Sequence, residues 1–174
     1  PILNTNPTNP MKQIIINSIV ALSALLLFAP GADAQARKKA DEATEAWHYD
    51  IEPASEAKQG TYVIRVCSYS SRTNPALEQC LKNAVHGVIF KGYSALGNIS
   101  GKTALAREPG IETQKADFFK PFFADGGDFR KFASQVGDEV ERTKVGREVK
   151  VCMQVKVMAD DLRKYLEAAG IIKG

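Results

Sequence analysis

Residues 147–158 read REVKVCMQVKVM, and this stretch decides the fold. Over ten of its residues, valines and a methionine alternate with charged residues, a glutamine and Cys152. Because successive side chains of a strand point to opposite faces of a sheet, the alternation predicts a strand with one face on a core and one nearer to solvent. Residues 139–144 precede it, and the turn at 145–146 between the two segments predicts a hairpin.

Two more strands are predicted earlier in the chain. Residues 47–51 read WHYDI, in which aromatic and apolar residues alternate with His48 and Asp50. Pro53 is expected to end this strand, because proline has no N–H to give to a strand ladder. Residues 61–69 read TYVIRVCSY, and their β-branched and aromatic content is typical of a strand.

Helical spacing appears in three segments. Residues 75–90 carry an apolar stripe, and Gly92 is expected to end this helix. Residues 128–136 are predicted to form a second amphipathic helix, and residues 161–169 a third, capped by Asp160. The stripe of the first helix consists of Leu77, Cys80, Leu81, Ala84, Val85 and Val88.

The order of these elements predicts the fold class. Strands and helices are interleaved as β-β-α-loop-α-β-β-α, which favours an α+β fold: a small antiparallel sheet of about four strands with two to three helices packed on one face. Residues 47–174 are expected to form this single domain. Residues 94–114 are rich in Gly, Ser, Thr and Pro, and a loop of this length is often functional.

The first third of the chain has the composition of a secretory signal. Met11 and Lys12 precede an uncharged apolar run at residues 14–28, and small residues follow up to Ala34. Residues 1–34 are therefore predicted to be a leader and signal peptide cleaved after Ala34, and residues 35–46 a polar linker. The run has about 15 residues, whereas a membrane span needs about 20, so a membrane anchor is disfavoured.

Charge and cysteine content narrow the class of protein further. The net charge is +3, and the basic residues do not gather as they do in nucleic-acid-binding proteins. We expect an exported protein, periplasmic, outer-membrane-associated or extracellular, with no transmembrane span in the mature chain. In such a compartment Cys67 and Cys152 are candidates for a disulfide, because each lies on the less apolar face of its strand.

Motifs for cofactors are weak, and no cofactor or metal is expected. Residues 100–103 read SGKT and resemble the end of a phosphate-binding loop, but Leu96 stands where that motif needs a glycine. His48, Asp50 and Glu52 share one face of the first strand. A solvated outer face explains that arrangement as simply as a metal site does.

Several side chains are candidates for binding or catalysis. Cys67 or His86 would serve a small hydrolase or thiol enzyme, although neither lies in a catalytic motif. Exposed Trp47 and Tyr49 would suit a glycan- or peptidoglycan-binding module. An aromatic segment contains Phe118, Phe119, Phe122 and Phe123. It is expected to form a short helix or turn with Pro121 in an early position. Its four phenylalanines are interpreted either as part of the core or as a patch that docks a partner.

Three stretches carry a resemblance to known proteins. NAVHGVIFKGY at residues 83–93, FFKPFFADGGDFRKF at 118–132 and VKVMADDLRKYLEAAGIIKG at 155–174 resemble a group of small uncharacterised exported proteins of Gram-negative bacteria. The order of elements is also similar to the α+β domain of curli-secretion-channel proteins and of the flagellar outer-membrane lipoprotein family. The chain lacks the lipidation cysteine and the membrane-inserting hairpin of those families.

The resemblance implies an envelope-associated role without catalytic residues. The favoured function is therefore a non-enzymatic binding or assembly module for another envelope protein. Its sheet edge or the 94–114 loop would supply the contact.

Overall fold

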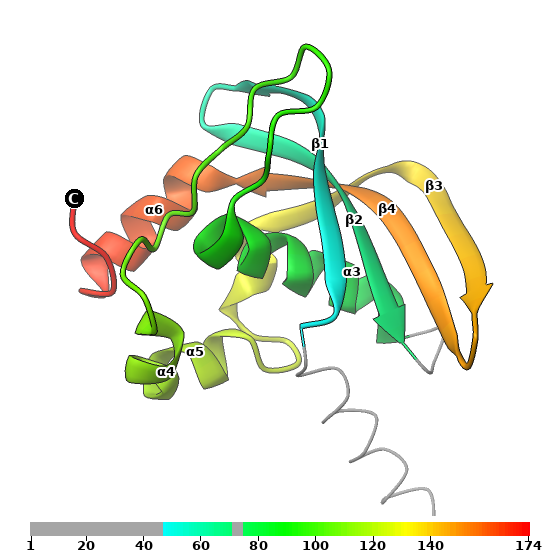
Figure 1. The fold of residues 1–174 in the computed structure, drawn as a ribbon. Coiled ribbons are helices and arrows are strands. Elements are labelled where there is room, and N and C mark those ends of the chain that lie inside the picture. The colour runs from blue at the N-terminus through cyan, green and yellow to red at the C-terminus, as the bar shows by residue number, and fades with distance from the viewer. Residues whose placement is uncertain (1–46, 71–74) are drawn as a thin grey trace, which may run out of the picture. The chain divides into compact units, whose positions relative to one another are not determined.

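The computed structural model describes residues 47–70 and 75–174 (Figure 1). The leader, signal peptide and linker predicted for residues 1–46 lie outside the described residues. The elements in chain order are β1 (Tyr49–Lys58), β2 (Thr61–Ser70), α3 (Pro75–His86), the π-helix η2 (Gly87–Lys91), α4 (Ile111–Gln114), α5 (Ala116–Phe122), the 3-10 helix η3 (Asp128–Lys131), β3 (Ala133–Val145), β4 (Glu148–Met158) and α6 (Ala159–Ala168).

Four antiparallel strands form one open sheet in the order β1-β2-β4-β3. Two hairpins, β1-β2 and β3-β4, are joined where β2 pairs with β4 along its full length, with Cys67 opposite Cys152. The helix α3 packs against β2 and β4, and Figure 1 shows it crossing one side of the sheet. The α+β prediction is confirmed.

The alternation in β4 has the predicted physical basis. Val151, Val155 and Val157 are 0% exposed and face the helices, whereas Gln154 and Lys156 between them are exposed. The stripe of α3 lies on these valines, and its Cys80, Ala84 and Val85 are 0% exposed as well. Burial of this shared apolar surface stabilises the sheet and the helix together.

A row of buried polar groups fixes α3 against β2 and β4. The Asn83 side-chain amide donates to the Ser68 hydroxyl at 2.8 Å and accepts a hydrogen bond from Gln79 at 2.8 Å. The Cys80 thiol donates to the Val151 carbonyl at 3.4 Å. Satisfied groups of this kind specify one register of helix on sheet, because any other register would leave them unpaired.

Two predictions about prolines are wrong. β1 continues through Pro53 to Lys58, with Pro53 opposite Ile64. The strand tolerates proline because β1 is an edge strand, and the register shifts directly after Pro53. Pro121 lies near the end of α5, not in an early position, and the helix ends at the next residue.

The helix predicted for residues 128–136 is also wrong. Only Asp128–Lys131 is helical, as a single 3-10 turn, and β3 begins at Ala133. That turn is enough to bury Phe129, which is 0% exposed, and Phe132, which is 7% exposed. Ala133 then pairs with Val157 in β4. The residues that follow Ala133 are therefore part of a strand and do not continue the helix.

The ends of the other helices differ only in detail from the prediction. After His86, the first helix continues as the π-helix η2, and Gly92 ends it with φ 66° and ψ −166°. α6 begins at Ala159, and Asp160 lies inside its first turn and does not cap it. The Asp160 backbone N–H donates to the Gly60 carbonyl at 3.0 Å, which joins the β1-β2 turn to the start of α6.

Within residues 47–70 and 75–174, no helix is both long and apolar enough to cross a bilayer.

Candidate functional site

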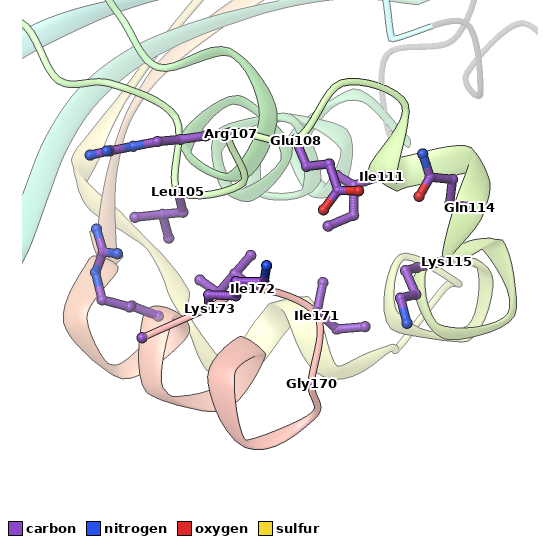
Figure 2. A pocket seen from close by; sticks show the side chains of 12 residues that line it. Leu105, Arg107, Glu108, Ile111, Gln114, Lys115, Gly170, Ile171, Ile172 and Lys173 are labelled. Carbon is purple, nitrogen blue, oxygen red and sulfur yellow. The ribbon is translucent and has the colours of Figure 1, made fainter.

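A pocket of about 790 Å³ lies between the 94–114 loop with its α4 helix and the C-terminal segment after α6. Figure 2 shows side chains from the two segments facing each other across it. This volume is in the range of small-molecule sites. The lining residues are Leu105, Arg107, Glu108, Ile111, Gln114, Lys115, Arg163, Gly170, Ile171, Ile172, Lys173 and Gly174.

The pocket combines an apolar floor with a basic rim. Leu105, Ile111 and Ile171 are 4–7% exposed, so only their edges reach the pocket. The lining includes four basic side chains and one acidic side chain, that of Glu108. The basic side chains are those of Arg107, Lys115, Arg163 and Lys173. In the part of the chain that the structure describes they form no ion pair, so their charges are available to a ligand.

The α4 wall of this pocket is attached to the core through His86. Glu112, next to Ile111 of the pocket floor, lies with its carboxylate 3.1 Å from His86 Nε2. The Tyr49 hydroxyl lies 2.7 Å from His86 Nδ1. With Glu112 ionised, Nε2–H donates to the carboxylate and the Tyr49 hydroxyl donates to Nδ1, which satisfies both nitrogens of a neutral ring.

Aromatic side chains enclose this histidine. The Trp47 ring stacks on the His86 ring with centroids 3.6 Å apart, and Phe90 and Phe123 lie 4.7 Å and 5.7 Å away. His86 is 3% exposed as a result. The Trp47 side chain also hydrogen-bonds Glu112. The arrangement is therefore a buried polar chain from Tyr49 to α4 that holds one wall of the pocket in place.

Burial shifts the pKa of each of the three linked groups Tyr49, His86 and Glu112. Desolvation, assisted by the positive charge of Lys91, lowers the pKa of His86 to about 3. Desolvation raises the pKa of Tyr49, and the charge of Glu112 adds to that effect. Desolvation also raises the pKa of Glu112, against the opposing effects of the Trp47 hydrogen bond and of Lys91. His86 is accordingly neutral at physiological pH.

The low His86 pKa predicts that the domain loses stability in mild acid. Between the folded pKa of about 3 and the ordinary value of 6.5, the unfolded chain binds more protons, so stability rises with pH across this window. We expect the free energy of unfolding to fall by up to about 1.4 kcal/mol per pH unit on acidification below 6.5. The raised Glu112 pKa acts in the opposite sense from that group's ordinary value of 4.5 upward, so the fall is clearest just below pH 6.5.

Urea unfolding at pH 6.5, 6.0, 5.5 and 5.0 measures this slope, with His86→Gln as the control, because glutamine does not titrate. The variant should lose most of the slope, whatever its overall stability. A slope that is the same in both proteins would contradict a buried, neutral His86.

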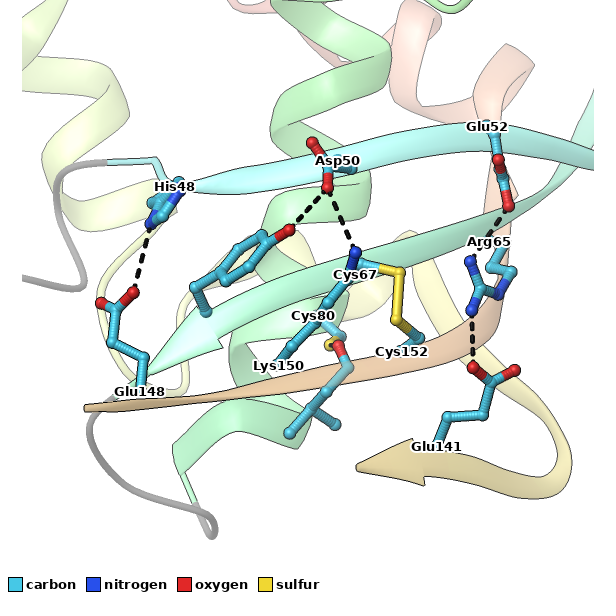
Figure 3. A network of polar contacts seen from close by, with 12 residues as sticks. His48, Asp50, Glu52, Arg65, Cys67, Cys80, Glu141, Glu148, Lys150 and Cys152 are labelled. Atoms are coloured by element: carbon cyan, nitrogen blue, oxygen red, sulfur yellow. Dashed lines mark hydrogen bonds and ion pairs between the residues drawn. A yellow bond between two sulfur atoms is a disulfide. The ribbon is translucent and has the colours of Figure 1, made fainter. Parts of the chain in front are cut away.

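A second polar cluster covers the face of the sheet opposite α3 (Figure 3). Arg65 bridges Glu52 at 3.1 Å and Glu141 at 2.7 Å, which links three strands. Asp50 accepts from the Tyr69 hydroxyl at 2.9 Å and lies 3.6 Å from the Lys150 ammonium. Charged side chains from neighbouring strands thus neutralise one another across this face.

The candidate metal residues are part of this cluster. Asp50 and Glu52 share the outer face, as predicted, but their carboxylates contact Tyr69, Lys150 and Arg65. His48 stacks on Tyr69 with centroids 4.3 Å apart. Among the described residues, no group of three or more His, Cys, Asp or Glu side chains is arranged to hold a metal ion.

The same face carries the disulfide between Cys67 and Cys152, the pair that the sequence suggested. Cys67 lies between Val66 and Ser68, which face α3, so its sulfur points to the other side of the sheet. The two cysteines are 3% and 4% exposed, because the surrounding long side chains cover them. Cys67 and His86 therefore lie on opposite sides of the sheet and do not form a catalytic pair.

The remaining candidate residues lie mainly in the core. Phe119, Phe122 and Phe123 are 3–7% exposed and pack on one another, and Phe118 is partly buried against Tyr165. This placement favours the core interpretation over a docking patch. Tyr49 is 6% exposed, and Trp47 lies flat on His86, so the pair does not present two free ring faces to a sugar.

Comparison with known proteins gives no relative. No protein-family model matches the chain, and no curated protein or solved structure is significantly similar to it. The resemblance to small exported proteins and to the curli and flagellar α+β domain stays a prediction. The features that bear on function are therefore the pocket, the polar clusters and the sheet edges of this chain.

Sequence reasoning missed most of the pocket. Glu112, Arg107 and Lys115 belong to a stretch without periodicity, and Arg163 and Lys173 lie on the polar side of the last helix and beyond it. The length of the 94–114 loop was the signal that pointed to this region. Residues 102–103 of the SGKT stretch line a separate, shallower pocket of about 500 Å³ with Lys91 and Tyr93.

Proposed function

We propose that this chain is an exported binding module for an envelope component that presents an apolar group next to a negatively charged one. The pocket between the 94–114 loop and the C-terminal segment is its binding site. The observation that carries the proposal is the combination of an apolar floor with four basic side chains that have no acidic partner in the described part of the chain.

The chemistry of the pocket supports this class of ligand. Leu105, Ile111 and Ile171 offer apolar contact but no hydrogen bond, so they favour the hydrocarbon part of a ligand. Arg107 and Arg163 present guanidinium groups, which bind carboxylate and phosphate oxygens in pairs. A cationic ligand would meet repulsion from the same rim.

The Cys67–Cys152 bond supports export, because disulfides persist in oxidising compartments and are rare in the cytosol. It also weakens the alternative of a thiol enzyme at Cys67, whose sulfur is already bonded. The alternative of a hydrolase at His86 has less support than a binding role, since that ring is 3% exposed and both its nitrogens are engaged.

Titration calorimetry with decyl phosphate as the probe tests the binding site. We expect saturable binding of one decyl phosphate, weaker binding of inorganic phosphate, and no binding of decyltrimethylammonium. The variant R107E/R163E should bind decyl phosphate at least about tenfold more weakly, because two attractive contacts become repulsive. Lys156→Glu is the control, since this exposed lysine lies in β4 away from the pocket.

Two results would count against the site. Equal affinity for the anionic and the cationic decyl probes would show that the basic rim does not select the ligand. R107E/R163E changes the net charge by twice as much as Lys156→Glu does. A loss of binding free energy in Lys156→Glu that is half or more of the loss in R107E/R163E would therefore show that only net charge matters.

Export is tested separately by the mass of the protein purified from the cells that make it. We expect a mature chain that begins at Gln35. A protein that begins at Met11 and carries free Cys67 and Cys152 thiols would contradict export.

A further inference from the structure

We propose that the free edge of β3 pairs with the same edge of a second copy of this chain, as an antiparallel strand pair that makes a dimer. The strand β3 is 13 residues long, and among the described strands only β4 is its neighbour in the sheet. Its side chains from Glu141 to Val145 are all exposed, so no described element covers this end of the strand on either face. An edge of this kind is a template for another strand.

The hairpin geometry shows which backbone groups are free. Val145 and Glu148 are paired across the two-residue turn 146–147, and in such a hairpin the pair that flanks the turn is hydrogen-bonded. Hydrogen-bonded and non-hydrogen-bonded pairs alternate along an antiparallel ladder. The N–H and C=O groups of Glu141 and Thr143 therefore point to β4, and those of Arg142 and Lys144 point outward.

The order of charges along this edge is self-complementary in one direction only. Asp138, Glu139 and Glu141 come first, and Arg142 and Lys144 follow. In an antiparallel pair of two copies, the acidic half of each strand lies beside the basic half of the other. A parallel pair would place like charges side by side, which is unfavourable.

The alternation of side chains sets the register. Residues opposite each other in an antiparallel pair share a face, so even-numbered positions meet even-numbered positions. A pair centred on Glu141 sets Val140 opposite Arg142. It also brings Lys144 of one copy beside the acidic residues 138–139 of the other, in the irregular segment before Val140, and symmetry repeats both contacts. Glu141 then faces its own counterpart, but each Glu141 is already paired with Arg65 at 2.7 Å.

The other edge of the sheet is a poorer template. β1 contains Pro53, which has no N–H, and its register with β2 shifts twice, between Pro53 and Ser55 and between Ser55 and Lys58. In β3 the irregularity is confined to the start, between Gln135 and Val140, where Gly137 has φ 66°. The stretch from Glu141 to Val145 is regular and presents the free edge.

Sedimentation velocity of the purified disulfide-bonded protein, over a wide concentration range, tests the dimer. The variants Asp138→Lys and Lys144→Asp should each weaken dimerisation roughly tenfold, because two symmetry-related attractions become repulsions. The double variant D138K/K144D should restore it. Lys156→Asp is the control for Lys144→Asp, because it makes the same charge change on β4, which has no free edge.

Mixing the two single variants gives the sharper test. Asp138→Lys carries lysine at both positions and Lys144→Asp carries aspartate at both, so the mixture should form heterodimers more readily than either variant forms homodimers. Added salt should weaken the heterodimer. Circular dichroism of each variant checks that it is folded.

A protein that stays monomeric up to its solubility limit would overturn the proposal, and would mean that the edge charges prevent strand pairing. A dimer whose affinity is the same in both single variants, with no preference in the mixture, would also overturn it. Either result leaves the pocket and its ligand untouched.

Discussion

Replacing Cys67 and Cys152 together by alanine is expected to lower the free energy of unfolding by about 4.5 kcal/mol. The disulfide joins residues 85 positions apart, so it removes many conformations from the unfolded chain. On the chain-entropy model a closed loop of this length stabilises the folded state by between about 3 and 5 kcal/mol. This is a large part of the 5–15 kcal/mol that is typical of a domain.

Urea unfolding with and without a reductant measures the effect. The oxidised protein should unfold at a higher urea concentration than the reduced protein, and the double variant should match the reduced protein in both conditions. Cys80→Ala is the control: it removes a buried thiol that is not part of the disulfide, so its stability should remain sensitive to reductant. An oxidised protein no more stable than the double variant would contradict the prediction.

Gly92→Ala is expected to cost at least about 3 kcal/mol. At φ 66° and ψ −166° the backbone is in a region that essentially only glycine adopts, and other residues there cost about 1–3 kcal/mol. An added Cβ would also lie against the Lys102 carbonyl oxygen and 2.8 Å from the Ala104 nitrogen. These are backbone atoms, so the chain after the π-helix would have to move away.

Gly97→Ala is the matched control for this substitution. Gly97 also has a positive φ, of 58°, but a Cβ there meets nothing within 4 Å. Its cost should be limited to the left-handed backbone, about 1 kcal/mol. Denaturation midpoints of the two variants compare the costs directly, and equal midpoints would mean that the contact between residues 92 and 102–104 does not constrain the fold.

The sequence predicted the sheet well because its strands obey a single rule. In β4 each valine faces the helices and each polar residue faces away, so the period of two is visible without knowledge of the neighbours. The same alternation placed Cys67 and Cys152 on one face of the sheet. The register between β2 and β4 sets the two cysteines directly opposite each other. It depends on pairing between distant parts of the chain, so the sequence alone does not predict it.

The error at residues 128–136 arose where two periods overlap. Phe129, Phe132, Ala133 and Val136 fit helical spacing, but pairing with β4 converts the chain to strand from Ala133 onward. The 94–114 loop has no period at all, so its contribution to the pocket and the Glu112–His86 contact depend on tertiary packing alone. The sequence marks His86 and Tyr49 as candidates for different roles, but it shows neither their contact nor the contact of His86 with Glu112.

The position of the Cys67–Cys152 bond has a consequence for a chain that has been cut. Six elements lie wholly between the two cysteines: α3, η2, α4, α5, η3 and β3. A protease that cleaved a peptide bond in the exposed 107–110 segment would therefore leave two fragments still joined covalently through the centre of the sheet. Such a nicked molecule would run as one band on a non-reducing gel and as two after reduction, and both halves of the sheet would stay together.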